Sequence, residues 1–122
     1  MSREDVRLLG RWGESVVADW LRGNGYKVIG AGYRCRFGEV DLIATNDKYI
    51  CFTEVKMRKD AKFAHAREFV DRHKQERLRL TAEHYLCQYP SELQPRFDVA
   101  EVYAPMGIST KDPQIIYIEN AF

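Results

Sequence analysis

The chain has 122 residues, of which 45% are hydrophobic and 30% charged, and this composition predicts one globular domain spanning residues 1–122. The formal net charge of +1 excludes a polycation, so that any contact with nucleic acid must come from local patches. The apolar runs are too short to span a bilayer and the first residues are too charged for a signal peptide, which predicts a cytoplasmic protein with no membrane partner.

The first predicted element is an amphipathic helix. Ser2 followed by Asp5 resembles a capping box, and apolar residues then recur at helical spacing until residues 23–25, Gly-Asn-Gly, end the pattern. A short strand is expected at 26–29, and the two glycines of 30–32 predict a bend after it.

Two strands joined by a turn carry the most informative residues. Apolar and polar residues alternate along both of them, at 38–44 and 50–56. If the turn between them is centred on residues 47 and 48, Asp41 and Glu54 lie directly opposite each other on one face of the hairpin.

The rest of the chain predicts one more helix and two more strands. A polar connection runs from 57 to about 68, and the helix that follows, at about 70–89, ends before Pro90. Two late strands are expected at 97–103 and 115–118. This order of elements indicates the α/β class, with a mixed central sheet flanked by helices.

Asp41, Glu54 and Lys56 form a candidate metal site. Two carboxylates at this spacing repel each other unless a positive charge lies between them, and burial of either one unpaired is unfavourable by several kcal/mol. A hard divalent cation with oxygen ligands fits, with Lys56 as a point charge beside it. The alternative is an ordinary ladder of ion pairs on a solvated face of the sheet.

Segments spread over nearly the whole chain carry a family resemblance: 13–14, 33–44, 52–56, 74–75, 96–99 and 118–122. On these residues the chain resembles the YraN-like family of small bacterial proteins, in the restriction-endonuclease-like superfamily and near the archaeal Holliday-junction resolvases. The superfamily pattern is a proline-aspartate followed by an acidic residue, one spacer and a lysine. Asp41, Glu54 and Lys56 match it, and Val40 replaces the proline.

The resemblance implies a restriction-endonuclease-like fold and metal-assisted hydrolysis of phosphodiester bonds. Asp41 and Glu54 are then expected to bind Mg²⁺ or Mn²⁺, and Lys56 to orient or activate the attacking water. The resemblance implies DNA rather than RNA as the substrate, and the likeness to resolvases implies branched or structured DNA. The same likeness implies a homodimer.

Two further residues match positions of the family pattern. Glu14 corresponds to a glutamate that related resolvases use as a further metal ligand, and a helical wheel places it at the edge of the apolar stripe, apart from the arginines of its helix, Arg7, Arg11 and Arg22. The alternative is a boundary residue paired with one of these arginines. Gln75 is a candidate catalytic residue that contacts the water or a phosphate, and the alternative is a structural hydrogen bond to a backbone carbonyl.

Local basicity predicts contacts with nucleic acid near this site. The candidate side chains are Arg34, Arg36, Arg58, Lys59, Arg72 and Lys74. Acidic residues interrupt the run, so a solvated helix face is the alternative. A non-catalytic nucleic-acid-binding module is the main rival to the nuclease, and a protein-interaction subunit is the third hypothesis. Asp98, further along, is expected to form an ion pair with Arg96 or with a neighbouring strand and to have no catalytic role.

Overall fold

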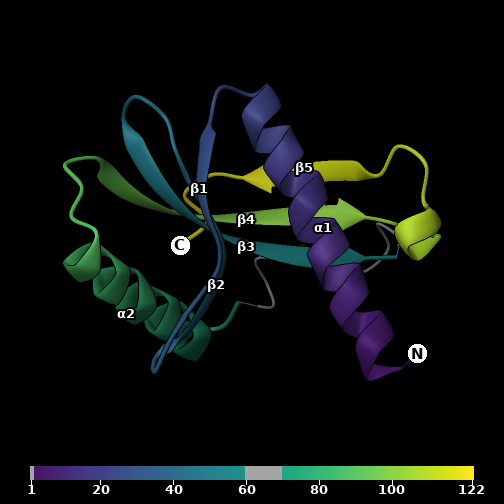
Figure 1. Ribbon diagram of the computed structural model, residues 1–122, viewed down its shortest axis with the longest axis horizontal. Coiled ribbons are helices and arrows are strands. Elements are labelled where there is room, and N and C mark those ends of the chain that lie inside the picture. Colours follow the sequence, from purple (N-terminus) through teal and green to yellow (C-terminus); the bar gives the residue numbers. More distant parts are fainter. Residues whose placement is uncertain (1, 60–69) are drawn as a thin grey trace.

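Two α-helices and a five-stranded sheet make up residues 2–59 and 70–122, which are the residues that this computed structural model describes (Figure 1). In chain order the elements are α1 (Arg3–Gly23), β1 (Lys27–Cys35), β2 (Gly38–Thr45), β3 (Tyr49–Arg58), α2 (Arg72–Gln88), β4 (Gln94–Tyr103), the 3-10 turn η2 (Gly107–Ser109) and β5 (Gln114–Ile118). The predicted α/β class, with a mixed sheet flanked by helices, is confirmed. Neither helix of the described residues has the length and apolar character needed to cross a membrane.

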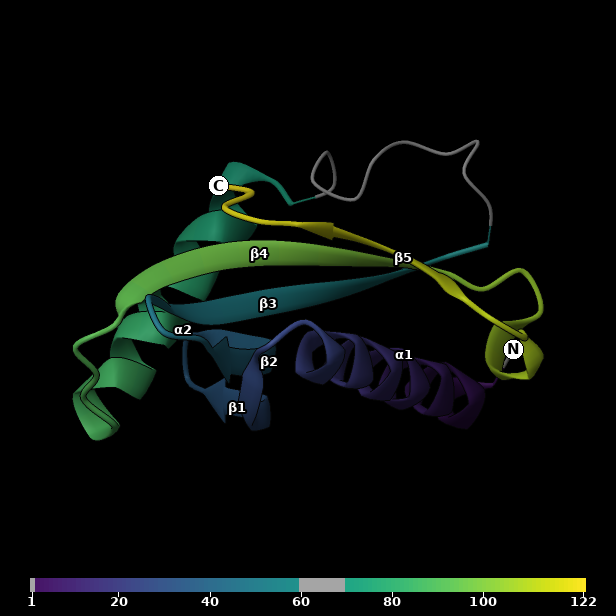
Figure 2. The same cartoon turned by 90° about the horizontal axis from the view of Figure 1, so that it is seen from above.

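The sheet has the strand order β1-β2-β3-β4-β5. Strands β3 and β4 are parallel and the other neighbours are antiparallel. A parallel pair needs a crossover connection, and α2 lies within it. Helix α1 packs on one face of the sheet, where Leu21 belongs to the same core cluster as Leu42 and Val102, whereas α2 packs on the other face, in a cluster with Phe52 and Val99. Figure 2 shows α1 lying along its face of the strands.

Helix α1 begins as its capping pattern predicts. The Ser2 hydroxyl accepts the Asp5 N–H at 3.1 Å, and the Asp5 carboxylate accepts the Ser2 N–H at 3.2 Å. Further along, the sulfur of Met57 occupies the space in which a side chain at Gly13 would begin. The helix can therefore lie close against β3 at this point, which brings the next residue, Glu14, to the sheet.

The boundaries predicted for the strands are partly wrong. The bend expected at 30–32 lies inside β1, which continues to Cys35, and a shift of register between Val28 and Gly30 takes the place of the bend. Pairing with β2 overrides the local preference of the glycines, since a β-bulge accommodates them within a strand. Strand β4 also begins earlier than expected, at Gln94.

The connection predicted at 57–68 begins later than expected. Met57 and Arg58 belong to β3, and the remainder of the connection, from residue 60 onward, lies outside the described residues. Helix α2 begins at Arg72, two residues later than expected, because Asp71 is its N-cap and accepts the Lys74 N–H at 2.8 Å.

Candidate metal and nucleic-acid site

The candidate site lies where the β1–β2 hairpin leaves the rest of the sheet. The register between β2 and β3 ends at Leu42↔Thr53, and one step further it would set Asp41 opposite Glu54, as the predicted turn requires. Beyond this point Val40 packs with the α2 cluster, although Leu42 packs with the α1 cluster. The alternation of the β2 side chains between the two faces of the sheet therefore breaks at Asp41, which borders a hollow on each side.

The Asp41 carboxylate occupies this point of divergence. Its Oδ2 accepts a hydrogen bond from the Val55 N–H at 2.8 Å, just beyond the end of the β2–β3 ladder. Burial raises the pKa of Asp41 from its ordinary value of 3.8 to about 7, and the nearby carboxylates of Glu54, Glu14 and Glu39 add to the rise. A negative charge here is therefore unfavourable until a proton or a cation neutralises it.

Glu54 presents one carboxylate oxygen to two lysines. Its Oε1 lies 2.9 Å from the Nζ of Lys74 and 3.6 Å from the Nζ of Lys56. The side chains of Glu54 and Lys56 are only 11% and 21% exposed, which does not match an ion-pair ladder on a solvated face. Burial and a hydrogen bond with Lys74 lower the pKa of Lys56. The three predicted residues therefore meet in one place, and Lys74 joins them.

The donor atoms at this point suit a hard divalent cation. Carboxylate oxygens are the ligands that Mg²⁺ and Mn²⁺ prefer, and Mg²⁺ is commonly held by one or two carboxylates together with waters and phosphate oxygens. Within residues 2–59 and 70–122, no group of three or more acidic, histidine or cysteine side chains forms a ready metal cage. The site therefore fits a cation held by Asp41 and Glu54, with Glu14 outside the pair in this conformation.

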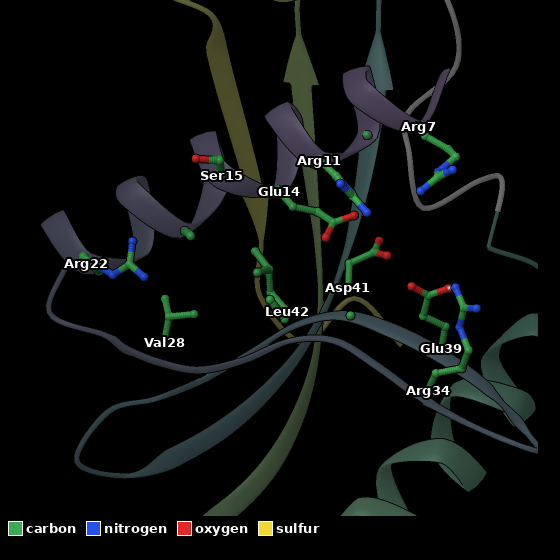
Figure 3. A pocket seen from close by; sticks show the side chains of 14 residues that line it. Arg7, Arg11, Glu14, Ser15, Arg22, Val28, Arg34, Glu39, Asp41 and Leu42 are labelled. Carbon is green, nitrogen blue, oxygen red and sulfur yellow. Dashed lines mark hydrogen bonds and ion pairs between the residues drawn. The ribbon is translucent and has the colours of Figure 1, made fainter. Parts of the chain in front are cut away.

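A cleft of about 790 Å³ opens between α1 and the β1–β2 hairpin (Figure 3). Glu14 from α1 and Asp41 from β2 point toward one another across it. Burial raises the pKa of Glu14, the carboxylates of Glu39 and Glu54 add to the rise, and Arg11 opposes it. Glu14 thus faces the sheet, in the neighbourhood of the carboxylate pair.

The expectation that Glu14 lies apart from the arginines of α1 is wrong. Three arginines line the same cleft as Glu14: Arg7, Arg11 and Arg22. Positions 7, 11 and 14 are spaced by four and then three residues, so a straight helix places them side by side. That spacing is the signal from which the arginine-lined wall could have been predicted.

A second hollow, of about 350 Å³, lies on the other side of β2. Asp41, Glu39 and Glu54 border it, and the first turns of α2 contribute three basic or titratable side chains, His73, Lys74 and Arg77. The N-terminus of a helix carries a partial positive charge, which adds to that of these side chains. The acidic residues of β2 therefore lie between two hollows that both contain cationic groups.

Three of the predicted nucleic-acid-binding residues border these hollows or the hairpin between them. Arg34 lines the α1-side cleft and pairs with Glu39 at 3.2 Å, and Lys74 lies in the α2-side hollow. The guanidinium of Arg36 stacks on the ring of Phe37 at 4.8 Å, at the turn that joins β1 to β2.

The other three are not among the described residues that line either hollow. Arg58, at the end of β3, is 3.7 Å from the fully buried Glu101 and its own side chain is 16% exposed, so that its charge is engaged inside the protein. Lys59 and Arg72 are exposed.

Gln75 makes a structural hydrogen bond to a backbone carbonyl, which is the alternative to a catalytic role that its sequence position allowed. Its Nε2 donates to the Val70 carbonyl at 2.8 Å, which ties the residue before the N-cap to the first turns of α2. The lining of neither hollow, as the structure describes it, includes Gln75. The neighbouring Lys74, rather than Gln75, reaches the carboxylates.

The electrostatics of Asp41 predict that Asp41→Asn stabilises the metal-free protein. Because folding raises the pKa of Asp41 from 3.8 to about 7, the ionised carboxylate opposes folding. This penalty is absent below the lower value, grows as the pH rises between the two, and is complete above the upper value. The amide can still accept the Val55 N–H. In EDTA at pH 8 we expect a gain of about 2 kcal/mol in the free energy of unfolding.

Urea denaturation at pH 8 and at pH 5 measures this effect. The advantage of Asp41→Asn should be larger at pH 8 than at pH 5, and an equal effect at both pH values would contradict the assigned environment. Asp47→Asn, in the exposed β2–β3 turn, is the control and should change stability by less than about 0.5 kcal/mol at either pH.

Comparison with known sequences identifies a family. The profile of the uncharacterised protein family UPF0102 matches residues 13–102. A UPF0102 protein of Acetivibrio thermocellus is 37% identical over 99% of this chain and 95% of its own length, and one of Caldanaerobacter subterraneus subsp. tengcongensis is 36% identical over 100% of both chains. A UPF0102 protein of Prosthecochloris aestuarii is 42% identical over 79% of this chain and 76% of its own length. The chain therefore belongs to the family UPF0102, as the YraN-like resemblance predicted.

Proposed function

We propose that this protein is a metal-dependent nuclease that hydrolyses phosphodiester bonds in DNA, with structured or branched DNA as its substrate. Asp41 and Glu54 hold Mg²⁺ or Mn²⁺, and Lys56 acts at the attacking water. The observation that carries the proposal is the burial of two carboxylates and a lysine where β2 leaves β3. A surface that only binds nucleic acid has no use for paired carboxylates, which repel phosphate.

We also assign the chain to the restriction-endonuclease-like fold. The mixed sheet with its parallel β3–β4 pair and a helix on each face supports this assignment. So does the position of the acidic residues, with Asp41 on β2 and Glu54 and Lys56 on the neighbouring strand.

The chain's own residues are arranged for hydrolysis. A bound divalent cation supplies a Lewis acid for the phosphate and a water of lowered pKa. The hydrogen bond from Val55 fixes the Asp41 carboxylate in advance, so that little reorganisation is needed. Burial lowers the pKa of Lys56, which makes its Nζ a better partner for proton exchange with the attacking water than a fully solvated lysine. Lys56 and Lys74 both place positive charge where negative charge builds on the phosphate.

The two hollows suggest a path for the substrate strand. The α1-side cleft offers Arg7, Arg11 and Arg22, the α2-side hollow offers Lys74 and Arg77, and both border Asp41. A phosphodiester chain that crosses β2 at Asp41 meets cationic side chains on both sides of the carboxylates. Contacts of this kind recognise phosphates and carry no sequence information.

A non-catalytic nucleic-acid-binding module is the second candidate. One observation favours it, namely that Lys74 lies against Glu54 and supplies a positive charge without any metal ion. In that case the carboxylates and lysines would form a structural cluster beside a phosphate-binding groove. This candidate predicts tight, salt-sensitive binding of DNA that is left intact.

Cleavage of a panel of DNA structures tests the proposal. Single-stranded, duplex, flapped and four-way-junction DNA are incubated with Mg²⁺, Mn²⁺ or EDTA. We expect metal-dependent cleavage, most rapid on the branched members of the panel. Intact DNA with salt-sensitive binding would favour the binding module.

The homodimer that the resemblance implies stays a prediction, and sedimentation with and without a junction measures it.

The arginine-lined wall of α1 predicts a defect in binding. Replacing Arg7 and Arg11 with glutamine removes two positive charges from the cleft and should weaken binding of a labelled junction about 10-fold or more at moderate salt. The slope of log K against log salt should fall by about one for each lost phosphate contact. Fluorescence anisotropy in EDTA measures both quantities.

A matched control distinguishes charge in the cleft from charge elsewhere on the protein. Lys48→Gln together with Lys111→Gln removes the same charge at exposed positions that are not among the described lining residues of either hollow, and should leave affinity nearly unchanged. Equal losses in the two double variants would mean that the α1 cleft does not bind the strand.

A further inference from the structure

The first turn of α2 brings a lysine to the proposed metal site. Asp71 caps the helix by accepting the Lys74 N–H at 2.8 Å, which sets the position of this turn. From there the Nζ of Lys74 reaches Glu54 Oε1 at 2.9 Å. The Nζ of Lys56 is 3.6 Å from the same oxygen, so Lys74 is the tighter partner. Its side chain is 38% exposed, so it also has access to solvent.

A divalent cation and Lys74 need the same carboxylate. Mg²⁺ binds carboxylate oxygens at about 2.0–2.1 Å. An ammonium that kept its contact of 2.9 Å would then lie within about 5 Å of a cation on Oε1. Positive charges so close together in a half-buried site repel strongly. Glu54 therefore cannot hold the divalent cation and the Lys74 ammonium at full strength at the same time.

We propose that Lys74 is an internal counter-cation, which holds the Glu54 carboxylate in the metal-free protein and is displaced from it when a divalent cation binds. The inference rests on the proposed metal site and adds a role for a residue outside the family's acidic and lysine pattern. The displaced ammonium remains in the α2-side hollow, beside His73 and Arg77, where a phosphate replaces Glu54 as its partner.

This exchange of partners couples metal binding to DNA binding. A phosphate that attracts Lys74 frees Glu54 for the cation, and a cation on Glu54 frees Lys74 for the phosphate. Because coupling between two binding events is reciprocal, each ligand should raise the affinity for the other by the same factor. A fixed ion pair between Lys74 and Glu54 would produce no such coupling.

Titration of Mn²⁺ into the DNA-free protein by calorimetry tests the proposal. Lys74→Met should bind Mn²⁺ about 10-fold more tightly than the wild type, because the competing ammonium is gone. Lys56→Met removes the same charge from a longer contact of 3.6 Å and should have a smaller effect. Lys48→Met, in the exposed β2–β3 turn, should not change the affinity. Circular dichroism and cooperative melting establish that each variant is folded.

The outcomes separate this inference from the nuclease itself. Unchanged or weaker Mn²⁺ binding by folded Lys74→Met overturns the inference, while cleavage by the wild type leaves the nuclease intact. Binding by Lys74→Met but not by the wild type supports the inference in its strongest form. If neither protein binds Mn²⁺, the inference fails together with the metal site, and the cleavage panel alone decides on the nuclease.

Discussion

Asp41→Asn should lower Mn²⁺-dependent cleavage of the preferred DNA by at least about 100-fold, since the loss of one preorganised electrostatic group commonly lowers kcat by 10²–10³. The substitution keeps the size of the side chain and its hydrogen bond to Val55 but removes the charge that holds the cation.

Lys56→Met should cause a loss of similar size while leaving Mn²⁺ bound, because Lys56 acts at the water and the phosphate and is not a metal ligand. Single-turnover kinetics with saturating Mn²⁺ measures both effects.

The same substitution should have opposite effects on stability and on catalysis. Asp41→Asn is expected to stabilise the metal-free protein, because it removes a buried carboxylate whose pKa is raised to about 7. A variant that loses activity because it unfolds would show the reverse. Lys48→Gln serves as the control for charge and should cleave like the wild type. Cleavage that persists in Asp41→Asn would refute the assignment of the metal site to Asp41, even if the protein proves to be a nuclease.

Local signals in the sequence predicted several elements of this fold correctly. The capping box of Ser2 and Asp5 defines the start of α1, because it depends on residues within one turn. The register of β2 and β3, centred on residues 47 and 48, follows from a period of two and a short turn. These features are local in the chain, which is why a single sequence carries them.

Contacts between distant segments could not be predicted in this way. The glycines of 30–32 have the local preferences of a bend, and only pairing with β2 makes them part of a strand. The alternation of β2 predicts one face for Val40 and Leu42, yet the two pack in different clusters. The divergence of β2 from β3 that separates them also creates the site at Asp41.

In the candidate site, too, local patterns predicted some contacts and missed those between distant segments. Asp41, Glu54 and Lys56 lie on paired strands, so their spacing along the chain predicts their proximity. Lys74 reaches Glu54 only because α2 returns across the sheet and its cap at Asp71 sets the first turn there. The arginines of α1 border the cleft because the helix lies close against β3. The spacing of Arg7, Arg11 and Glu14 puts them on one side of the helix, but that this side faces a cleft, like the reach of Lys74, depends on where the helix docks, which no local pattern encodes.

A second buried charged cluster stabilises the fold away from the proposed metal site. Asp98 on β4 is fully buried and pairs with Arg96, whose side chain is 7% exposed, at 2.9 Å, so the predicted ion pair is confirmed. The carboxylate also accepts the Tyr117 hydroxyl at 2.6 Å and the Asn120 N–H at 2.9 Å. Asp98 thus ties β4 to β5 and to the segment that follows β5.

Asp98→Ala should therefore lower the free energy of unfolding by about 3–5 kcal/mol, because it leaves a buried guanidinium without its carboxylate and removes the acceptor of two further donors. Asp19→Ala breaks an exposed pair with Arg22, at 3.2 Å, and should cost less than about 0.5 kcal/mol. Urea denaturation compares the two. A loss below about 1 kcal/mol for Asp98→Ala would mean that Arg96 finds another partner. At temperatures where Asp98→Ala remains folded its Mn²⁺ affinity should be unchanged, since none of these contacts involves Asp41 or Glu54.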